Sequence, residues 1–426
     1  MKKESDQVIK KILILGNNDI QNDTRLLKNI YLLKNKFEID VFGISSSKNM
    51  SKYKIYKFKN YFHWNNIREK FLLKKNIIQK IFFILLNMHI FIISISNKFF
   101  HFIDFIKLFK YSGFITKNSK YSSYDYLWLQ DFEDVLLYFF LKKKFCNAKI
   151  IFDAHEIYDE TLIRNKSILL RGLFKYLILC VFNKFSKNVD HFLSVSEEIT
   201  LYYKNNFSFK ENTTFNTVFN SFCYDFQLIN SFKKKKHNHD FSLKKKLNIE
   251  QNKKIIIYLG VIHPWRGMDK IIDLALKLNK DFVCVFIGYG SHFNYYKSIT
   301  SNYKNIFFLD KVPEYELKMW TKDAFLGLML FEDIDLNHRL CLPNKLWQYA
   351  SAEVPFVSYN QFKEIKKLNR IFNIGYLFDM DTKLDDLKRE IENLPKEEYL
   401  IKAKNCKTFL DQTDYKIQIN SFIKHL

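Results

Sequence analysis

Short apolar runs alternate with amphipathic stretches from the start of the chain. Residues 11–16 form an apolar run ended by a glycine, residues 26–33 carry leucine and isoleucine at helical spacing, and residues 39–43 form a second apolar run. Runs of this length are typical of buried parallel strands, and the three segments fit a strand–helix–strand unit. Further strands are expected at 126–129, 149–152 and 191–195, and helices at 134–143, 169–185 and from Glu197.

The alternation stops between residues 225 and 252 and then resumes. The interruption contains Lys233–Asp240, which has no periodicity and no interleaved aromatics, so we interpret it as a solvated loop instead of a nucleic-acid patch. After it, strands are expected at 254–260, 282–288, 305–309, 325–330 and 354–358, and helices at 268–278, from 314, at 344–352 and from 385.

This order predicts an α/β protein with two doubly wound, Rossmann-like domains that face each other across a cleft. The predicted parts are an N-terminal domain at 1–220 with an apolar insertion at about 67–115, a linker at 221–252, a C-terminal domain at 253–400 and a terminal helix at 401–426. Ligands of such folds bind at the carboxyl ends of the strands.

Composition restricts the partners and the compartment. The chain has 426 residues, and its 68 Lys and Arg against 45 Asp and Glu give a net charge of +23. A surplus of this sign favours anionic partners such as nucleic acid, acidic lipid or phosphorylated ligands, although a lysine-rich composition accounts for about half of it. Six scattered cysteines form no C-x-x-C pair, which argues against a zinc ribbon and for a reducing compartment. The N-terminus has no apolar stretch typical of a secretory signal, so we expect a cytoplasmic protein.

Residues 77–109 are the most apolar part of the chain. Ile81–Ser96 carries no formal charge but is borderline short for a membrane span. Polar and basic positions, which fall on one stripe at helical spacing, favour a helix that lies on acidic headgroups; they are Lys80, Asn87, Ser94 and Lys98. We therefore expect peripheral association with the inner face of the cell membrane, with burial in the N-terminal domain and a spanning helix as alternatives.

Three polar residues end the predicted strand at 149–152. Asp153, His155 and Glu156 lie where a catalytic group is expected, and His155 could bind a sugar hydroxyl or stabilise charge near an anomeric centre. A satisfied structural cluster of polar groups explains the same pattern equally well.

Two loops of the C-terminal domain are candidate anion sites. Arg266 and Gly267 directly precede a predicted helix, whose free N–H groups together with a guanidinium suit a phosphate; an exposed arginine in a capping loop is the alternative. Gly288 and Gly290 follow the next strand and allow a ligand to approach the backbone. They do not extend to G-x-G-x-x-G, so a dinucleotide fingerprint is not supported.

A third loop opens the predicted helix at 344–352. Pro343 and Asn344 suit the start of a helix whose free N–H groups meet a diphosphate, and Lys345 adds positive charge. Gln348, one turn further on, could bind ribose hydroxyls. A plain N-cap role for Asn344 is the alternative.

Segments in chain order resemble the motifs of glycosyltransferase family 4 and its relatives with the two-domain B-type fold. The segments are Asn22–Leu27 (D-x-R-V), Asp125–Asp131 (ending H-x-H-D), Phe152–Glu156 (Y-D-x-H-E), Asp190–Glu197 (A-D-x4-V-S-E), Asn220, Tyr258–Gly267 (Y-x-G to K/R-G) and Pro343–Ala350 (P-N-K-L-F-E-Y-M). The resemblance covers most of the chain.

The resemblance implies a retaining, metal-independent transfer in which the nucleotide-sugar is a substrate and no cofactor is needed. It assigns the donor to the C-terminal domain, through Arg266, Gly267, Gly288, Gly290, Asn344, Lys345 and Gln348. It also implies that His155, with Asp153 and Glu156, lies near the donor sugar, and that the acceptor side is bordered by Asp23, Arg25 and Asp131.

Three positions depart from the family pattern. Val261 stands where the family often has an arginine, and Leu340 and Gln348 stand where it has the paired glutamates of E-x7-E. Gln348 retains hydrogen-bonding capacity, whereas Leu340 has none in its side chain. Either Glu332 or Asp333 holds the donor instead, or activity is weak.

Three functions follow from these observations. The first is a hexosyltransferase-like enzyme that transfers a sugar to a lipid-linked or surface-polysaccharide acceptor, such as a lipopolysaccharide precursor. The second is a nucleotide-sugar-binding or scaffold protein of glycan assembly that has lost catalysis. The third, a nucleic-acid-binding protein, is suggested by charge alone and lacks a recognisable reading motif.

Overall fold

A computed structural model describes residues 9–19, 23–44, 55–57, 112–113, 115–164, 168–223 and 241–426. The apolar segment at 77–109 and the charged loop at 233–240 lie outside these residues, so the predictions made for them stay predictions. The chain divides into two compact units. The first unit comprises Met1–Ser194 and Thr200–Asn216, and the second unit comprises Val195–Ile199 and Thr217–Leu426.

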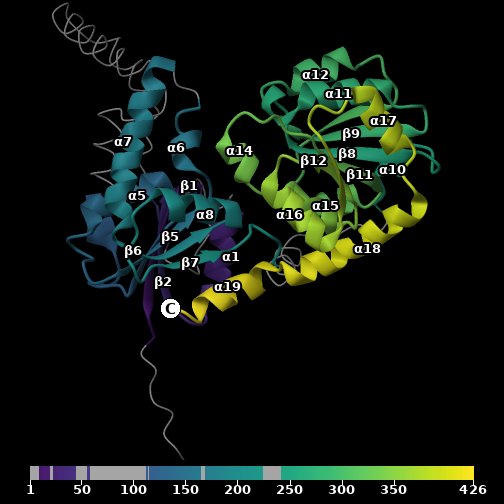
Figure 1. Ribbon diagram of the computed structural model, residues 1–426. Coiled ribbons are helices and arrows are strands. Elements are labelled where there is room, and N and C mark those ends of the chain that lie inside the picture. The colour runs from purple at the N-terminus through teal and green to yellow at the C-terminus, as the bar shows by residue number, and fades with distance from the viewer. Residues whose placement is uncertain are drawn as a thin grey trace, which may run out of the picture. The chain divides into compact units, whose positions relative to one another are not determined.

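The first unit is built on a seven-stranded sheet with the order β3-β2-β1-β4-β5-β6-β7 (Figure 1). The pairings from β3 through to β6 are parallel. Its strands are β1 (Lys11–Asp19), β2 (Glu38–Ile44), β3 (Ile55–Lys57), β4 (Tyr126–Leu129), β5 (Lys149–Ala154), β6 (Val189–Ser194) and β7 (Thr214–Thr217). Its helices are α1 (Thr24–Leu33), α5 (Phe132–Leu141), α6 (Tyr158–Thr161), α7 (Ile168–Ser186) and α8 (Glu197–Asn206), of which α8 begins in the second unit.

The second unit is built on a six-stranded parallel sheet with the order β10-β9-β8-β11-β12-β13. Its strands are β8 (Lys254–Val261), β9 (Phe282–Tyr289), β10 (Ile306–Asp310), β11 (Ala324–Met329), β12 (Phe356–Tyr359) and β13 (Gly375–Phe378). Its α-helices are α10 (Leu243–Lys246), α11 (Met268–Lys277), α12 (Phe293–Ile299), α13 (Leu317–Thr321), α14 (Leu336–Leu340), α15 (Lys345–Ser351), α16 (Lys363–Phe372), α17 (Leu384–Glu392), α18 (Lys396–Gln412) and α19 (Tyr415–Ile423). Two 3₁₀ turns, η1 (Pro264–Arg266) and η2 (Glu314–Glu316), complete it.

The apolar runs form the centres of both sheets because helices cover each face. In β8, Ile255 to Leu259 are five consecutive buried residues, as expected for a parallel strand packed on both sides. Helices α11 and α12 lie on one face of the second sheet, and α15 and α16 lie on the other (Figure 1). Helix α11 buries Met268, Ile271 and Ala275 against the sheet, which is one stripe at helical spacing.

The predicted fold class, with two doubly wound α/β domains, is confirmed. The strand expected at 126–129 is found there, and the other predicted strands agree to within a few residues. Sequence patterns missed β3, β7, β13, α6, α10, α12, α14 and α16. These elements are short or interrupted by charged residues; β7, for example, reads Thr-Phe-Asn-Thr and is half-buried throughout, so it has no apolar run to signal it.

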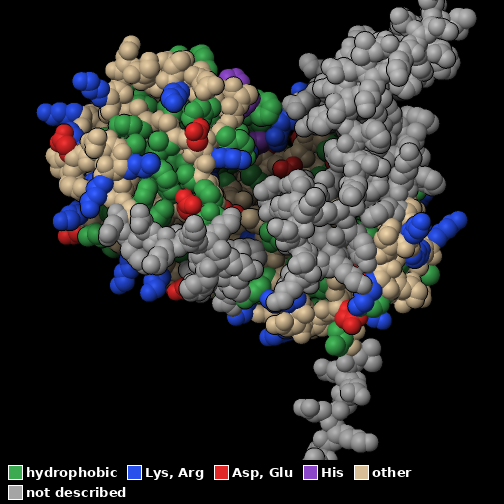
Figure 2. Space-filling view, turned by 180° about the vertical axis from the view of Figure 1, so that it is seen from behind, with side chains coloured by type: hydrophobic (Ala, Val, Ile, Leu, Met, Phe, Trp, Pro, Cys, Tyr) green, Lys and Arg blue, Asp and Glu red, His purple; other side chains and the backbone are tan. Residues whose placement is uncertain are grey.

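The positive charge is dispersed on the face of the molecule that Figure 2 presents. There the Lys and Arg side chains of the second unit are scattered, with Asp and Glu between them, and they do not gather in one patch. Within the described residues, no helix combines the length and the apolar character that crossing a bilayer requires.

Candidate active site

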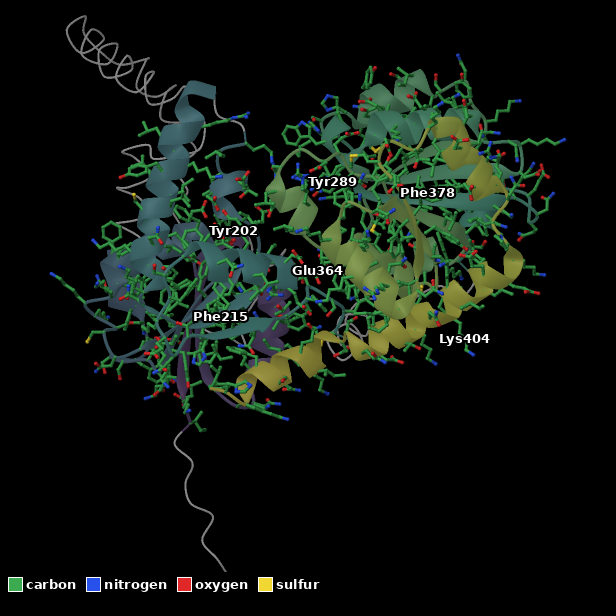
Figure 3. The ribbon with its side chains drawn as sticks, viewed as in Figure 1. Tyr202, Phe215, Tyr289, Glu364, Phe378 and Lys404 are labelled. Carbon is green, nitrogen blue, oxygen red and sulfur yellow. The ribbon has the colours of Figure 1, made fainter. Side chains whose placement is uncertain are left out.

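Each sheet has a point where the strand order reverses, and the predicted site residues end or follow the strands that meet there and the strands next to them. In the second unit the order reverses between β8 and β11, and in the first unit between β1 and β4. Loops that leave neighbouring strands in opposite directions open a crevice at the carboxyl ends, which is where ligands of doubly wound folds bind. In the second unit this end of β9 is marked by Tyr289 in Figure 3.

Lys345 is a buried cation near the switch point of the second unit. It is the first residue of α15, and its side chain is 9% exposed. Its Nζ lies 3.7 Å from the centroid of the Tyr258 ring and 5.0 Å from that of Phe331, but within the described part of the chain it has no hydrogen-bond partner. Aromatic faces attract a cation but do not replace the hydrogen bonds that an ammonium group makes in water. The described residues therefore supply no anion to this ammonium group.

Arg266 adds a second cation at the same place. It ends η1, is half-buried, and its guanidinium carbon lies 6.0 Å from the centroid of the Phe331 ring, which Lys345 approaches as well. Burial first, and the charge of Arg266 second, lower the pKa of Lys345 well below its usual value. Two neighbouring cations repel each other when no carboxylate lies between them. A doubly charged ligand such as a diphosphate would remove this repulsion and stabilise both charges.

Backbone geometry explains the glycines that lie beside the two cations. Gly260 has φ of +113°, and a Cβ built on it would lie 3.2 Å from Cε of Lys345, so a side chain there would press on the lysine stem. Gly267 has φ of +72°, and its Cβ would lie 1.6 Å from the carbonyl oxygen of Leu330. Gly267 thus lets the turn before α11 pack against the end of β11, which positions Arg266.

Neighbouring backbone leaves no room for a side chain at Gly288 or Gly290. A Cβ on Gly288 would lie 1.8 Å from the carbonyl oxygen of Gly260, and one on Gly290 would lie 2.3 Å from that of Ile262. The sequence predicted that these glycines let a ligand approach the backbone. In the structure, the backbone that lies close to them is that of β8 and the loop after it.

Asn344 and Gln348 lie on the same helix start as Lys345. Asn344 is exposed, and its Oδ1 accepts a hydrogen bond of 3.2 Å from Nδ2 of Asn220. Asn344 occupies the N-cap position of α15, but its side chain makes no capping hydrogen bond. Gln348 is half-buried one turn later.

The positions that depart from the family pattern all lie in the second unit. Leu340 is 6% exposed, and its carbonyl oxygen accepts a hydrogen bond of 2.7 Å from the Ser196 hydroxyl. Of the two proposed replacement carboxylates, Asp333 accepts hydrogen bonds of 2.6 and 2.8 Å from Nε of Arg339, and Glu332 is exposed. Val261 ends β8 and is half-buried.

A buried ion pair occupies the equivalent region of the first unit. Arg25 of α1 donates to Asp153 of β5 through Nε at 2.9 Å and Nη2 at 2.6 Å, and their side chains are 3% and 0% exposed. Burial, the largest single effect, would raise the pKa of Asp153, but the charges and hydrogen bonds of Arg25 and His155 together outweigh it and hold that pKa well below the usual range. The sequence assigned Arg25 to the acceptor side and Asp153 to catalysis; their mutual pairing favours a structural role for both.

His155 lies between two carboxylates. Its Nε2 is 3.9 Å from Oδ2 of Asp153 and its Nδ1 is 3.8 Å from Oδ1 of Asp131, and the side chain is 21% exposed. Burial lowers the pKa of His155, but Asp153 and Asp131 outweigh that effect and raise it above the ordinary value. A partly accessible imidazole can donate a hydrogen bond to a sugar oxygen.

Asp131 is held in place by a buried network. Its Oδ1 accepts a hydrogen bond of 3.3 Å from the Tyr158 hydroxyl, which also lies 2.9 Å from the carbonyl oxygen of Gln130. Burial, opposed by His155, raises the pKa of Asp131. Asp134, in the first turn of α5, accepts from the backbone of Gln130 at 3.0 Å, and burial raises its pKa to about 8.

The other two first-unit predictions lie at the edge of this network. Asp23 caps α1 by accepting a hydrogen bond of 2.9 Å from the Leu26 amide, while its charge raises the pKa of Asp131. The Glu156 side chain is exposed, and its backbone carbonyl accepts from the Tyr203 hydroxyl at 2.9 Å. Among the described residues, no group of three or more His, Cys, Asp or Glu has an arrangement that could hold a metal ion.

Sequence reasoning missed the aromatic walls of the cation site and the support of Asp131. Tyr258 lies in the carboxyl-terminal half of the central strand β8 and was noted only as part of the Y-x-G segment, and Phe331 follows β11 and was not singled out. Their position, at the carboxyl ends of the two strands that border the switch point, was the available signal. Tyr158 and Asp134 had no signal beyond proximity to the predicted strands.

Comparison with known proteins finds a family match within the second unit and a shared fold over nearly the whole chain. Residues 240–409 match the family described as "Glycosyl transferases group 1". None of the curated protein sequences compared matches the chain. Solved structures match over nearly all of it: sucrose-phosphate synthase from Thermosynechococcus elongatus (9% identity, 98% of each chain, TM-score 0.65) and HepE from Anabaena in complex with UDP (11% identity, 98% of this chain and 100% of that one, TM-score 0.60).

A third similar structure is WaaG, described as a glycosyltransferase involved in lipopolysaccharide biosynthesis (11% identity, 96% of this chain and 98% of that one, TM-score 0.62). Identities this low establish the shared fold only.

Proposed function

We propose that this chain is a glycosyltransferase, that it binds a nucleoside diphosphate sugar in its second unit, and that it transfers the sugar to a lipid-linked or surface-polysaccharide acceptor; the group 1 match of residues 240–409 and the shared two-domain B-type fold support this. The observation that carries the proposal is the Lys345 ammonium group, buried beside Arg266 with no anion in the described part of the chain. The complex of the similar Anabaena protein with UDP supports a uridine nucleotide as the first donor to test.

In this proposal the two cations stabilise the leaving group. When the bond between the anomeric carbon and the phosphate oxygen breaks, negative charge builds up on the diphosphate, and preorganised cations in a water-poor site lower the barrier. Lys345 and Arg266 supply this neutralisation, so the transfer needs no metal ion. Gln348, one turn after Lys345, then lies close enough to contact the ribose.

The polar network of the first unit serves the sugar hydroxyls in this proposal. His155 is its partly accessible member, and its raised pKa keeps a proton available for donation to a sugar oxygen. Asp153 orients and charges the imidazole, while Arg25 keeps Asp153 ionised. We propose retention of anomeric configuration, which NMR of the product made from an α-linked donor tests directly.

A thermal-shift screen of nucleoside diphosphates and their sugars tests the nucleotide part. Ligands that bind the folded chain raise its melting temperature by mass action, so UDP or a UDP-sugar should stabilise the wild type. Lys345→Met and Arg266→Ala should lose this stabilisation. Lys270→Met is the matched control, because the Nζ of Lys270 already donates to the carbonyl oxygen of Met380 at 2.9 Å. Equal stabilisation of all four proteins would exclude the assigned site.

A second candidate, a nucleotide-sugar-binding protein without transferase activity, is favoured by one observation. Leu340 and Gln348 occupy the positions of the paired glutamates, and Asp333 is engaged by Arg339. Stabilisation by nucleotide sugars without release of nucleoside diphosphate, with every acceptor tried, would support this candidate over the enzyme.

A further inference from the structure

The outer face of α7 carries a stripe of exposed apolar side chains. Leu173, Tyr176 and Leu177 are 55%, 64% and 41% exposed, and Cys180 is exposed as well. Spacings of three and four residues place all four on one side of the helix. The opposite side packs into the first unit through residues that include Phe182 and Phe185. Figure 1 shows α7 at the outside of the first unit, so the stripe is apolar surface in a helix that already buries its other face.

The charged residues of α7 itself are all basic. Residues 168–187 contain no Asp or Glu. Lys184 continues the stripe one turn beyond Cys180, and its Nζ lies 5.9 Å from the centroid of the Phe139 ring of α5. This contact places the exposed Lys142 and Lys143, which follow α5, at the same end of α7. The apolar stripe therefore ends in a group of exposed lysines.

We propose that this stripe, Leu173, Tyr176, Leu177 and Cys180, is the surface with which the chain rests on an acidic lipid bilayer. An apolar helix face next to lysines suits the boundary between acyl chains and anionic headgroups, where both are stabilised together. A second copy of the chain is a poorer occupant, because it would bring like-charged lysines together on a chain whose net charge is +23. The inference rests on the proposed function in one respect, that a lipid-linked acceptor requires access to a membrane.

Two native cysteines provide the test. Cys180 lies on the stripe, whereas Cys146, also exposed, follows α5 and is not part of α7. The full chain is labelled with an environment-sensitive fluorophore at Cys180 in a Cys146→Ser variant and at Cys146 in a Cys180→Ser variant. Both variants also carry Cys341→Ser, because Cys341 is half-buried. Quenching by aqueous iodide is then measured with phosphatidylcholine vesicles that contain or lack phosphatidylglycerol.

On vesicles with phosphatidylglycerol, quenching of the Cys180 label should fall by about fivefold or more as α7 enters the headgroup boundary, with little change for the Cys146 label. Unchanged quenching at Cys180, or failure of the protein to bind the vesicles, would overturn the proposal. Protection without vesicles would also overturn it: a second copy covers the stripe if protection grows with protein concentration, and the chain's own residues cover it if protection is constant.

Substitutions that place negative charge on the stripe give an independent measure of its contact with the membrane. Leu173→Glu with Leu177→Glu should weaken sedimentation with the acidic vesicles by about tenfold, because two anions replace apolar groups at the interface. Leu400→Glu with Ile401→Glu is the matched control, since both residues are 54% exposed on α18 of the other unit. Stabilisation by nucleotides without vesicles should be the same in all these variants, which separates failure of this surface from failure of the nucleotide site.

Discussion

The two units bury cations in contrasting ways at the carboxyl ends of their sheets. In the first unit, the Arg25 guanidinium is neutralised by Asp153 within the protein. In the second unit, the Lys345 ammonium group contacts aromatic faces, and no carboxylate of the described residues compensates it. A buried charge with an internal partner is part of the fold, whereas one without such a partner costs free energy that a ligand can recover. This difference distinguishes a structural ion pair from a binding site.

The strongest way to break the comparison is to remove the cation of the first unit. Arg25→Met leaves the Asp153 carboxylate buried without its partner, and we expect the free energy of unfolding to fall by about 3–5 kcal/mol. Urea denaturation measures the change. The double variant Arg25→Met/Asp153→Leu removes both charges and should recover most of the loss. A single variant within about 1 kcal/mol of wild type would show that the pair is not a structural element.

Removing the cation of the second unit should have the opposite sign. Lys345→Met replaces a buried, uncompensated charge by an apolar side chain of similar length, so the nucleotide-free protein should gain about 1–3 kcal/mol of stability. Urea denaturation without ligand gives the value, and Lys270→Met should show no gain because it loses a hydrogen bond. If Lys345→Met were destabilising, the lysine would have an internal partner after all.

The buried cations of the two units also show what the sequence could and could not predict. Arg266 and Lys345 were identified from their place in the chain, because each lies beside a glycine or proline where a predicted helix begins. The pairing of Arg25 with Asp153 joins residues 128 positions apart and depends on how α1 packs against β5. Alternation of apolar and polar residues carries no information on that packing, so Asp153 was assigned to catalysis.

The fold was more predictable than the site for a related reason. Buried parallel strands such as Tyr126–Leu129 are continuous apolar runs and are visible locally. The aromatic wall formed by Tyr258 and Phe331 uses residues of the same apolar kind, and only their contact with Lys345 reveals a second role.

The pH dependence of stability sharpens the comparison. The pKa of Lys345 in the folded chain lies well below its usual value of about 10.4, so between the two values the unfolded chain holds a proton that the folded chain has lost. The free energy of unfolding contributed by this group therefore rises with pH across that window, by at most about 1.4 kcal/mol per pH unit. Lys345→Met should lack this rise in denaturation series between neutral and alkaline pH.

Nucleotide affinity should change with pH in the opposite direction to stability. The diphosphate binds the charged ammonium group, so the affinity of the wild type falls as pH rises through the depressed pKa of Lys345. Isothermal titration calorimetry in buffers of different ionisation enthalpy should detect proton uptake on binding. Binding without proton exchange throughout this range would contradict the assignment.

The smallest effect on stability is expected for Arg266→Ala, because this arginine is half-buried and keeps contact with water. We expect less than about 1 kcal/mol of change in unfolding, yet a loss of nucleotide affinity of about 10- to 100-fold, as for a charge-assisted hydrogen bond to a buried ligand. Arg339→Ala is the control, since this exposed arginine already pairs with Asp333.

Removing Arg266 also removes a repulsion that lowers the pKa of Lys345, so the alkaline rise in stability should move to higher pH. If both residues grip one diphosphate, the affinity losses of Arg266→Ala and Lys345→Met will not add in the double variant. Strict additivity would mean that the two cations bind separate anions.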